Sequence, residues 1–353
     1  MPDVDPLHRN FDPLKRNADR AERLHQWFTA EIVDGYAARR DRAWSWDHTG
    51  EAAYLASVAE RRAEWAALLN PPHLTPLDEV RVSAAQVPGG HWLEVPVHSH
   101  LSAEGVLVVP EGARRLIVMQ HGLGSWPERV FGIPDANNGN RGLGADLVRR
   151  GYAVLAPLNL SMVDLRNRAQ DLARLAGTTM EGLELARCRL LLDAVADLHP
   201  EVDTGAAALI GVSWGGMAAQ FWTPLEDRFV AAASVAFFND RLRKMVVEDP
   251  EHYGTFAARG EHHAFLPNHL GVFADAELAS LICPRPFLVQ HGHHDPIGWS
   301  PQIEAEFTRT RRHWDELGVG DRVELHIHDG GHEVDKDNLL AWVDRNFPVT
   351  GTA

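Results

Sequence analysis

Residues 207–216 have the sequence Ala-Ala-Leu-Ile-Gly-Val-Ser-Trp-Gly-Gly, and this stretch decides the fold. It begins as an apolar run without alternation, which is typical of a strand buried on both faces of a sheet. Ser213 follows, with glycine two residues before it and two residues after it. A sharp strand-to-helix turn exposes a serine hydroxyl as a nucleophile, and glycines let the strand and helix pack closely. The stretch therefore predicts a nucleophilic Ser213; the alternative is an ordinary tight loop with a solvated serine.

Similar apolar runs occur on both sides of this stretch and predict a sheet. Helical patterns separate them near 143–150, 181–197, 215–222, 301–317 and 336–346. Repeated strand–helix units imply a doubly wound, mostly parallel sheet of the α/β class. Three earlier segments near 80–82, 91–97 and 105–110 suggest antiparallel strands. The expected core strands are 115–120, 153–157, 207–211, 230–237, 286–290 and 323–327.

The first 75 residues have helical spacing and no strand signal. Leu24, Phe28, Ile32 and Tyr36 recur at helical intervals, and a single helix is expected over 51–69. We therefore predict an N-terminal helical extension over 1–75 and a catalytic domain of the α/β class over 76–353. The extension is expected to pack on the main domain or on a second copy of the chain in a homo-oligomer.

A serine hydroxyl needs a general base, and the base needs an orienting acid. In the strand–turn–helix type of site the chain order is serine, acid, histidine. Asp295 and His332 follow two late strands in that order, at the edge where sites in parallel sheets gather. Asp240, which follows the fourth core strand, is the alternative acid. His326 and His328 compete with His332, but they belong to the strand itself.

A glycine-containing loop, His121-Gly122-Leu123-Gly124, follows another buried strand. Glycines let backbone amides approach a substrate and stabilise a developing oxyanion. We expect the amides of Leu123 and Trp214 to form that oxyanion hole. The alternative is an ordinary turn at the end of a strand.

The arrangement of these motifs resembles the α/β-hydrolase superfamily. Within it, the sequence is similar to the dienelactone hydrolase and acetyl-xylan-esterase-like group, which borders on the prolyl oligopeptidases. The run Leu-Ile-Cys-Pro-Arg-Pro-Phe-Leu at 281–288 is similar to a segment of those esterases. The resemblance implies hydrolysis of a small or medium carboxylic ester through an acyl-enzyme, with no cofactor. It covers residues 80–347.

Two alternative functions stay open from the sequence. One is a peptidase or acylaminoacyl hydrolase of the prolyl oligopeptidase type, although 75 helical residues cannot build a propeller domain. The other is a metal-dependent hydrolase that uses the cluster from His291 to Asp295, because paired histidines and a carboxylate bind zinc. No further series of ligands follows in order, so we expect no metal.

Candidate residues of the substrate pocket are His121, Gly122, Trp126, Phe265 and Trp299. The aromatic members offer apolar surface, and each could equally be part of the core. The loop that contains His262 and His263 is expected to line the pocket or form a lid, or else to be solvated.

The composition of the chain excludes some classes of binding partner. The formal net charge of −15 argues against a nucleic-acid partner and against attraction to an anionic membrane. Cys188 and Cys283 are expected to be apolar core residues, not a disulfide. Residues 1–5 show no signal peptide, and no stretch is apolar enough to span a membrane. We therefore predict a cytoplasmic protein that acts on a small-molecule ester.

Overall fold

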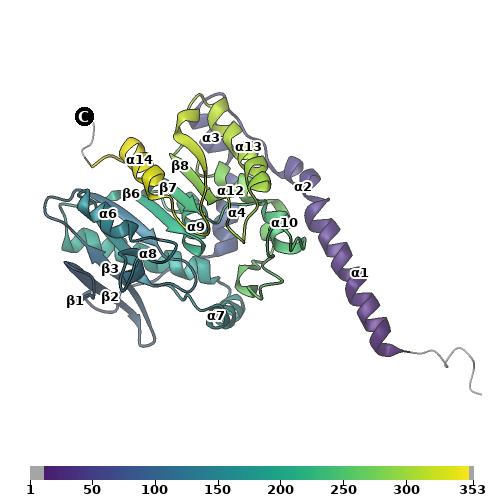
Figure 1. Ribbon diagram of the computed structural model, residues 1–353, viewed down its shortest axis with the longest axis horizontal. Coiled ribbons are helices and arrows are strands. Elements are labelled where there is room, and N and C mark those ends of the chain that lie inside the picture. Colours follow the sequence, from purple (N-terminus) through teal and green to yellow (C-terminus); the bar gives the residue numbers. More distant parts are fainter. Residues whose placement is uncertain (1–11, 350–353) are drawn as a thin grey trace, which may run out of the picture.

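The computed structural model describes residues 12–349, and its centre is a nine-stranded sheet (Figure 1). The strand order is β1-β2-β3-β5-β4-β6-β7-β8-β9. The strands from β5 to β9 in that order pair in parallel, whereas β1, β2 and β3 join the sheet through antiparallel pairs. The predicted doubly wound, mostly parallel sheet is thus confirmed. The strands are β1 (Arg81–Ala84), β2 (Gly90–His98), β3 (Leu101–Val108), β4 (Arg115–Gln120), β5 (Ala153–Pro157), β6 (Asp203–Val212), β7 (Phe229–Val235), β8 (Phe287–Gly292) and β9 (Val323–His328).

Helices cover both faces of this sheet. The described helices are α1 (Pro13–Val33), α2 (Tyr36–Ala43), α3 (Glu51–Ser57), α4 (Ala59–Leu69), α5 (Pro127–Val130), α6 (Leu143–Arg149), α7 (Val163–Leu175), α8 (Met180–Leu198), α9 (Trp214–Trp222), α10 (Arg241–Val246), α11 (His269–Val272), α12 (Asp275–Ser280), α13 (Ser300–Glu316) and α14 (Lys336–Asn346). Five of them, α5, α7, α10, α11 and α12, lie outside the helical segments expected from the sequence. α7 carries many charged residues and the other four have only four to six residues, so none shows a clear apolar period.

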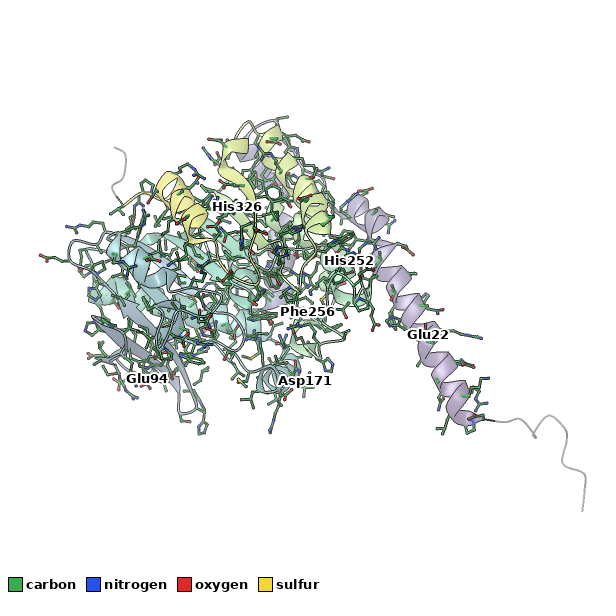
Figure 2. All side chains as sticks on the ribbon, in the orientation of Figure 1. Glu22, Glu94, Asp171, His252, Phe256 and His326 are labelled. Atoms are coloured by element: carbon green, nitrogen blue, oxygen red, sulfur yellow. The ribbon has the colours of Figure 1, made fainter. Side chains whose placement is uncertain are left out.

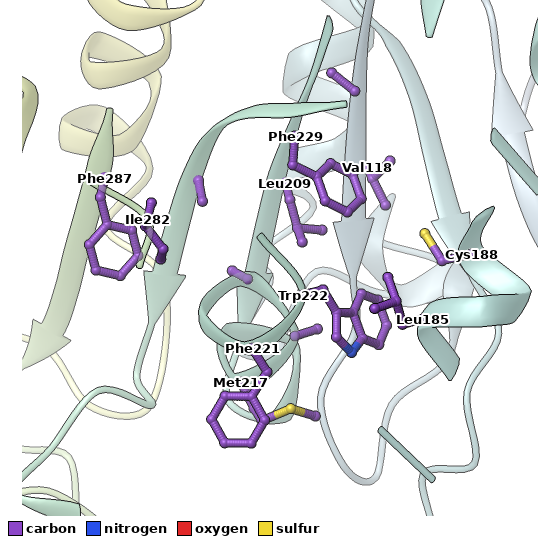
Figure 3. Packing of buried hydrophobic residues seen from close by; sticks show 14 of the residues in the cluster. Val118, Leu185, Cys188, Leu209, Met217, Phe221, Trp222, Phe229, Ile282 and Phe287 are labelled. Carbon is purple, nitrogen blue, oxygen red and sulfur yellow. The ribbon is translucent and has the colours of Figure 1, made fainter. Parts of the chain in front are cut away.

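The side chains of each central strand alternate between two cores. In β4, Val118 packs in the core that contains α8, α9 and α13, whereas Ile117 packs in the core that contains α6 and α14. Figure 3 shows the first core, where Phe229 and Leu209 of neighbouring strands face Trp222 of α9. Because apolar side chains leave both faces, these strands have continuous apolar sequences.

The N-terminal helices differ in how they meet the body. None of the side chains of α1 is buried, and Figure 1 shows this helix projecting away from the rest of the molecule. In contrast, Tyr54 of α3, Trp65 and Leu69 of α4, and Val58 between these two helices are buried in the main core. The expected single helix over 51–69 is wrong, because it is divided at Val58. From these two helices, Tyr54 Oη donates a hydrogen bond to the Ser280 carbonyl and Trp65 Nε1 donates one to the Phe221 carbonyl.

Two further observations bear on the predictions made from composition. Cys188 and Cys283 are buried free thiols, as expected. Within the described residues, no helix is long and apolar enough to cross a membrane. Residues 1–5, on which the signal-peptide prediction rested, lie outside the described part of the chain, and the domain limits at 1 and 353 lie outside it too.

Candidate active site

Ser213 lies in a sharp turn between the end of β6 and the start of α9. Its φ of 59° and ψ of −120° lie in a region that non-glycine residues rarely adopt, at a cost of about 1–3 kcal/mol. The neighbouring glycines are required by space. A Cβ on Gly211 would lie 2.1 Å from the Gly215 carbonyl oxygen, and a Cβ on Gly215 would lie 1.9 Å from the Gln120 carbonyl oxygen. The Gly-Xaa-Ser-Xaa-Gly spacing is thus explained by the close approach of the two glycines to each other and of Gly215 to the end of β4.

The structure brings Asp295 and His332 together from the loops that follow β8 and β9. His332 Nδ1 lies 2.7 Å from Asp295 Oδ2, and Asp295 Oδ1 accepts from the Ile297 amide at 2.9 Å. Since a carboxylate only accepts, Nδ1 carries the proton and Nε2 is left as the acceptor. Burial alone would raise the pKa of Asp295, but the hydrogen bond and charge of His332 hold that pKa below its ordinary value. The carboxylate therefore stays ionised and fixes the tautomer of His332.

Ser213 and His332 line the same two cavities. The larger cavity has a volume of about 310 Å³, and Phe237, Phe256 and Lys244 also line it. The smaller one, of about 240 Å³, is bordered by Asn137, Asn138 and Asn140, so its wall is rich in amide groups. A substrate centred on Ser213 can therefore place one group in each cavity.

The loop after β4 lies directly against the serine. A Cβ on Gly122 would lie 3.0 Å from Ser213 Cβ, so only glycine allows this approach. Leu123 lines both cavities. Within residues 12–349, no backbone acceptor is bonded to the amide of Leu123 or of Trp214. Both predicted oxyanion donors thus lack a backbone acceptor, and they belong to the two segments that meet at Ser213.

His121 supports this loop and does not line either cavity. Its ring is buried; Nε2 accepts from the Asn159 amide at 3.2 Å and Nδ1–H donates to the Gly122 carbonyl at 3.0 Å. Burial lowers the pKa of His121 to about 4, so the ring is neutral at pH 7. The expectation that His121 forms part of the substrate pocket is corrected accordingly: it holds Gly122 in place from behind.

The three aromatic residues expected to line the pocket lie elsewhere. Trp126 is 40% exposed and borders a separate surface hollow, with the Arg129 guanidinium stacked on its ring. Phe265 borders a different hollow next to α1. Trp299 packs against His252, with ring centroids 4.3 Å apart. Their positions in the sequence lie near the loops of the candidate site, but none of the three lines either cavity.

The structure also shows the contacts of the other residues whose roles the sequence left open. Asp240 caps α10, where its side chain accepts from the Arg243 amide. His326 Nε2 bonds to Asp335 Oδ2, and His328 Nε2 bonds to the Glu333 carbonyl. His263 is buried and packs edge-on against Trp214, with ring centroids 4.6 Å apart.

The histidines near Asp295 do not converge. His294 bonds to Asp329 Oδ1 at 2.9 Å, and His293 Nδ1 lies 3.4 Å from Ser300 Oγ. His291 Nε2 lies 3.6 Å from Asp295 Oδ2, the oxygen that is already bonded to His332. In the described part of the chain, no three His, Cys, Asp or Glu side chains are grouped as a metal site.

Sequence reasoning missed a buried ion network behind the site. Arg166 of α7 bonds to both oxygens of Glu184 and lies 3.3 Å from Glu181, and all three side chains are buried. The Arg166 guanidinium also lies 4.7 Å from the centre of the Trp214 ring. It therefore supports the residue that follows Ser213. Arginine and glutamate on helices are normally surface residues, so nothing in the sequence marked them.

Comparison with known proteins identifies the fold of this chain. No family model matches the sequence. YtaP of Bacillus subtilis (strain 168), a protein provisionally named as a hydrolase, is 25% identical over 268 residues, which are 71% of this chain and 86% of YtaP.

Two solved structures of esterases are similar in fold. One, from Bacteroides fragilis and provisionally named an acetyl xylan esterase, has a TM-score of 0.66 and 12% identity, covering 86% of this chain and 91% of its own. The other is a glucuronoyl esterase from Caldicellulosiruptor kristjansonii, with a TM-score of 0.57 and 20% identity, covering 83% and 86%. Together with the order of the strands, these similarities show that the chain has the α/β-hydrolase fold.

Proposed function

We propose that the protein is a serine carboxylic-ester hydrolase with Ser213 as nucleophile, His332 as general base and Asp295 as the orienting acid. The observation that carries the proposal is the 2.7 Å contact of His332 Nδ1 with the buried Asp295, next to a serine held at a strained φ of 59°. A nucleophile, a base and an orienting group in this relation are the signature of nucleophilic catalysis.

The reaction follows from this geometry. His332 Nε2 takes the proton of Ser213 as its oxygen attacks the ester carbonyl. The amides of Leu123 and Trp214 then hydrogen-bond to the oxyanion of the tetrahedral intermediate, and each donor is worth about 3 kcal/mol in comparable sites. His332 returns the proton to the leaving alcohol, and a water activated by the same histidine hydrolyses the acyl-enzyme. The scheme needs no cofactor.

An ester is a better candidate substrate than a peptide. The solved structures described above carry the names of esterases. Residues 13–69 form four helices, three of which supply side chains to the main core, so this part of the chain has no propeller.

Assays of wild type and Ser213→Ala with 4-nitrophenyl esters of increasing acyl length test the proposal. The wild type should hydrolyse short or medium esters, with or without a chelator, and Ser213→Ala should lose at least 10³-fold in kcat. Ser83→Ala, on the exposed edge strand β1, is the matched control and should keep wild-type activity. Retained activity in Ser213→Ala would contradict the serine mechanism, and loss of wild-type activity with chelator would favour a metal-dependent hydrolase.

The oligomeric state and the cellular location of the protein remain predictions. Homo-oligomer formation is tested by the mass of the protein in solution, measured by light scattering. A cytoplasmic location is compatible with the free thiols of Cys188 and Cys283, and cell fractionation tests it.

A further inference from the structure

Lys244 is a buried cation in the wall of the larger cavity. It belongs to α10, is 4% exposed, and lines this cavity together with Ser213, Trp214 and His332. Its ammonium group donates to the Gly254 carbonyl and lies 5.4 Å from the centre of the Phe256 ring. Figure 2 shows Phe256 in the body of the molecule. An ammonium has three protons to donate, so one backbone acceptor leaves capacity for a ligand.

The two arginines of this region are paired with carboxylates. Arg259 Nε lies 2.5 Å from Glu261 Oε1, and Arg241 Nη2 lies 2.8 Å from Asp275 Oδ2. Asp295 is bonded to His332. Among residues 12–349, no carboxylate oxygen lies within 4.0 Å of Lys244 Nζ. The cavity therefore contains one cation without a counter-ion, next to the nucleophile.

A buried charge without a partner is unfavourable. Burial, and then the charges of Arg241 and Arg259, lower the pKa of Lys244 to about 7, while Glu261 and Asp295 act in the opposite direction. Tyr253, His291 and His332 are the other titratable groups that face Lys244 or line its cavity. Lys244 therefore gains and loses its proton near neutral pH, and an anion bound in the cavity would complete the missing pair.

We propose that the physiological ester carries a carboxylate on the group that occupies the larger cavity, and that Lys244 binds this carboxylate. Phe237, Phe256 and Ile297 line the same space, so a short apolar spacer separates the carboxylate from the ester carbonyl. The substrate class is therefore the half-esters of dicarboxylic acids or the acyl esters of hydroxy acids. This inference rests on the proposed ester hydrolase activity and specifies which esters the enzyme prefers.

Matched pairs of charged and neutral esters test the inference. The pair for a carboxylate on the acyl side is mono-4-nitrophenyl glutarate against 4-nitrophenyl pentanoate. The pair for a carboxylate on the alcohol side is 4-acetoxybenzoate against its methyl ester. In at least one pair, the wild type should favour the anionic ester in kcat/KM on the order of tenfold to a hundredfold, as expected for a charged hydrogen bond.

Two variants assign this preference to Lys244. Lys244→Met should reduce the ratio of the two kcat/KM values to about one, because it removes the charge and keeps the length of the chain. Lys336→Met is the matched control, since Lys336 pairs with Asp146 outside both cavities and its loss should leave the ratio unchanged.

The pH dependence of the wild type provides a second test that needs no variant. The preference should be greatest below pH 7 and should fall as the pH rises through about 7, because kcat/KM reports ionisation of the free enzyme. Hydrolysis without preference for either anionic ester, or a preference that does not change with pH, would overturn the role of Lys244 and leave the hydrolase proposal intact. Failure to hydrolyse any of the four esters would instead contradict the proposed function itself.

Discussion

Replacement of Asp295 by asparagine should inactivate the enzyme through the tautomer of His332. In the native site, the Ile297 amide donates to Asp295 Oδ1 while His332 donates to Oδ2. The Ile297 N–H will keep the oxygen of the new amide at the Oδ1 position, so its NH₂ group will face His332. The neutral His291, whose Nδ1–H donates to the Gly292 carbonyl, presents Nε2 as an acceptor on the same side and favours the same orientation. His332 Nδ1 must then accept, its proton moves to Nε2, and Nε2 can no longer take the proton of Ser213.

The expected loss is about 10⁴-fold in kcat, equal to about 5.5 kcal/mol of transition-state stabilisation, as for the same change in other triads. Asp240→Asn is the matched control. Asp240 caps α10, and asparagine caps helices as well as aspartate does, so this variant should keep its stability and activity within a few-fold. Steady-state hydrolysis of 4-nitrophenyl acetate, with thermal melting to check the fold, measures both variants. An Asp295→Asn enzyme within tenfold of wild type, or an equal loss in Asp240→Asn, would refute this account of the acid.

Three other perturbations test the surroundings of the site. Gly215→Ala should cost about 1–3 kcal/mol of unfolding free energy or more, because its Cβ would meet the Gln120 carbonyl; unchanged urea unfolding would contradict the close packing of the turn. Arg166→Met should cost about 3–5 kcal/mol by leaving the buried carboxylate of Glu184 without its partner, and addition of Glu184→Gln should recover part of this loss in denaturant unfolding. His269→Phe removes two buried ring nitrogens that have no hydrogen-bond partner among residues 12–349, so it should keep or raise stability at pH 7. Burial, and then the charge of Arg241, lower the pKa of His269 to about 3; protons therefore bind the unfolded chain first, and the native protein loses stability as the pH falls below about 6.5. Between pH 6 and 4 the unfolding free energy of the wild type should fall more steeply than that of His269→Phe, by about 1.4 kcal/mol per pH unit. If the two proteins lose stability in parallel as the pH falls, the ring is not buried as described.

The fold and the loops that hold Ser213, Asp295 and His332 could be predicted because they are encoded locally. Apolar runs bounded by glycine and proline located the central strands, since strands buried on both faces need apolar residues at every position. The turn at Ser213 has its own signature, because a Cβ at Gly211 or Gly215 would overlap the backbone. Asp295 and His332 were predicted by their position after strands, and the structure brings them to 2.7 Å.

The walls of the cavities could not be predicted, because they depend on how distant segments meet. Trp126 and Phe265 follow the right strands or loops, yet their rings face other hollows. Lys244 and Arg166 come from polar helices whose sequences indicate exposure, and only the tertiary packing buries them. The length of a helix was likewise misjudged at Val58, where the apolar period continues although the helix stops.

The most direct test of the central claim is the site of covalent labelling by a fluorophosphonate, mapped by mass spectrometry of the whole protein. A fluorophosphonate reacts with a serine only where a base activates it and an oxyanion hole receives the phosphoryl oxygen. We predict one adduct per chain, on Ser213, with esterase activity lost in proportion to labelling and no adduct on Ser213→Ala. An adduct on a different residue, or full activity in a protein labelled at Ser213, would contradict the assignment of Ser213 as the nucleophile.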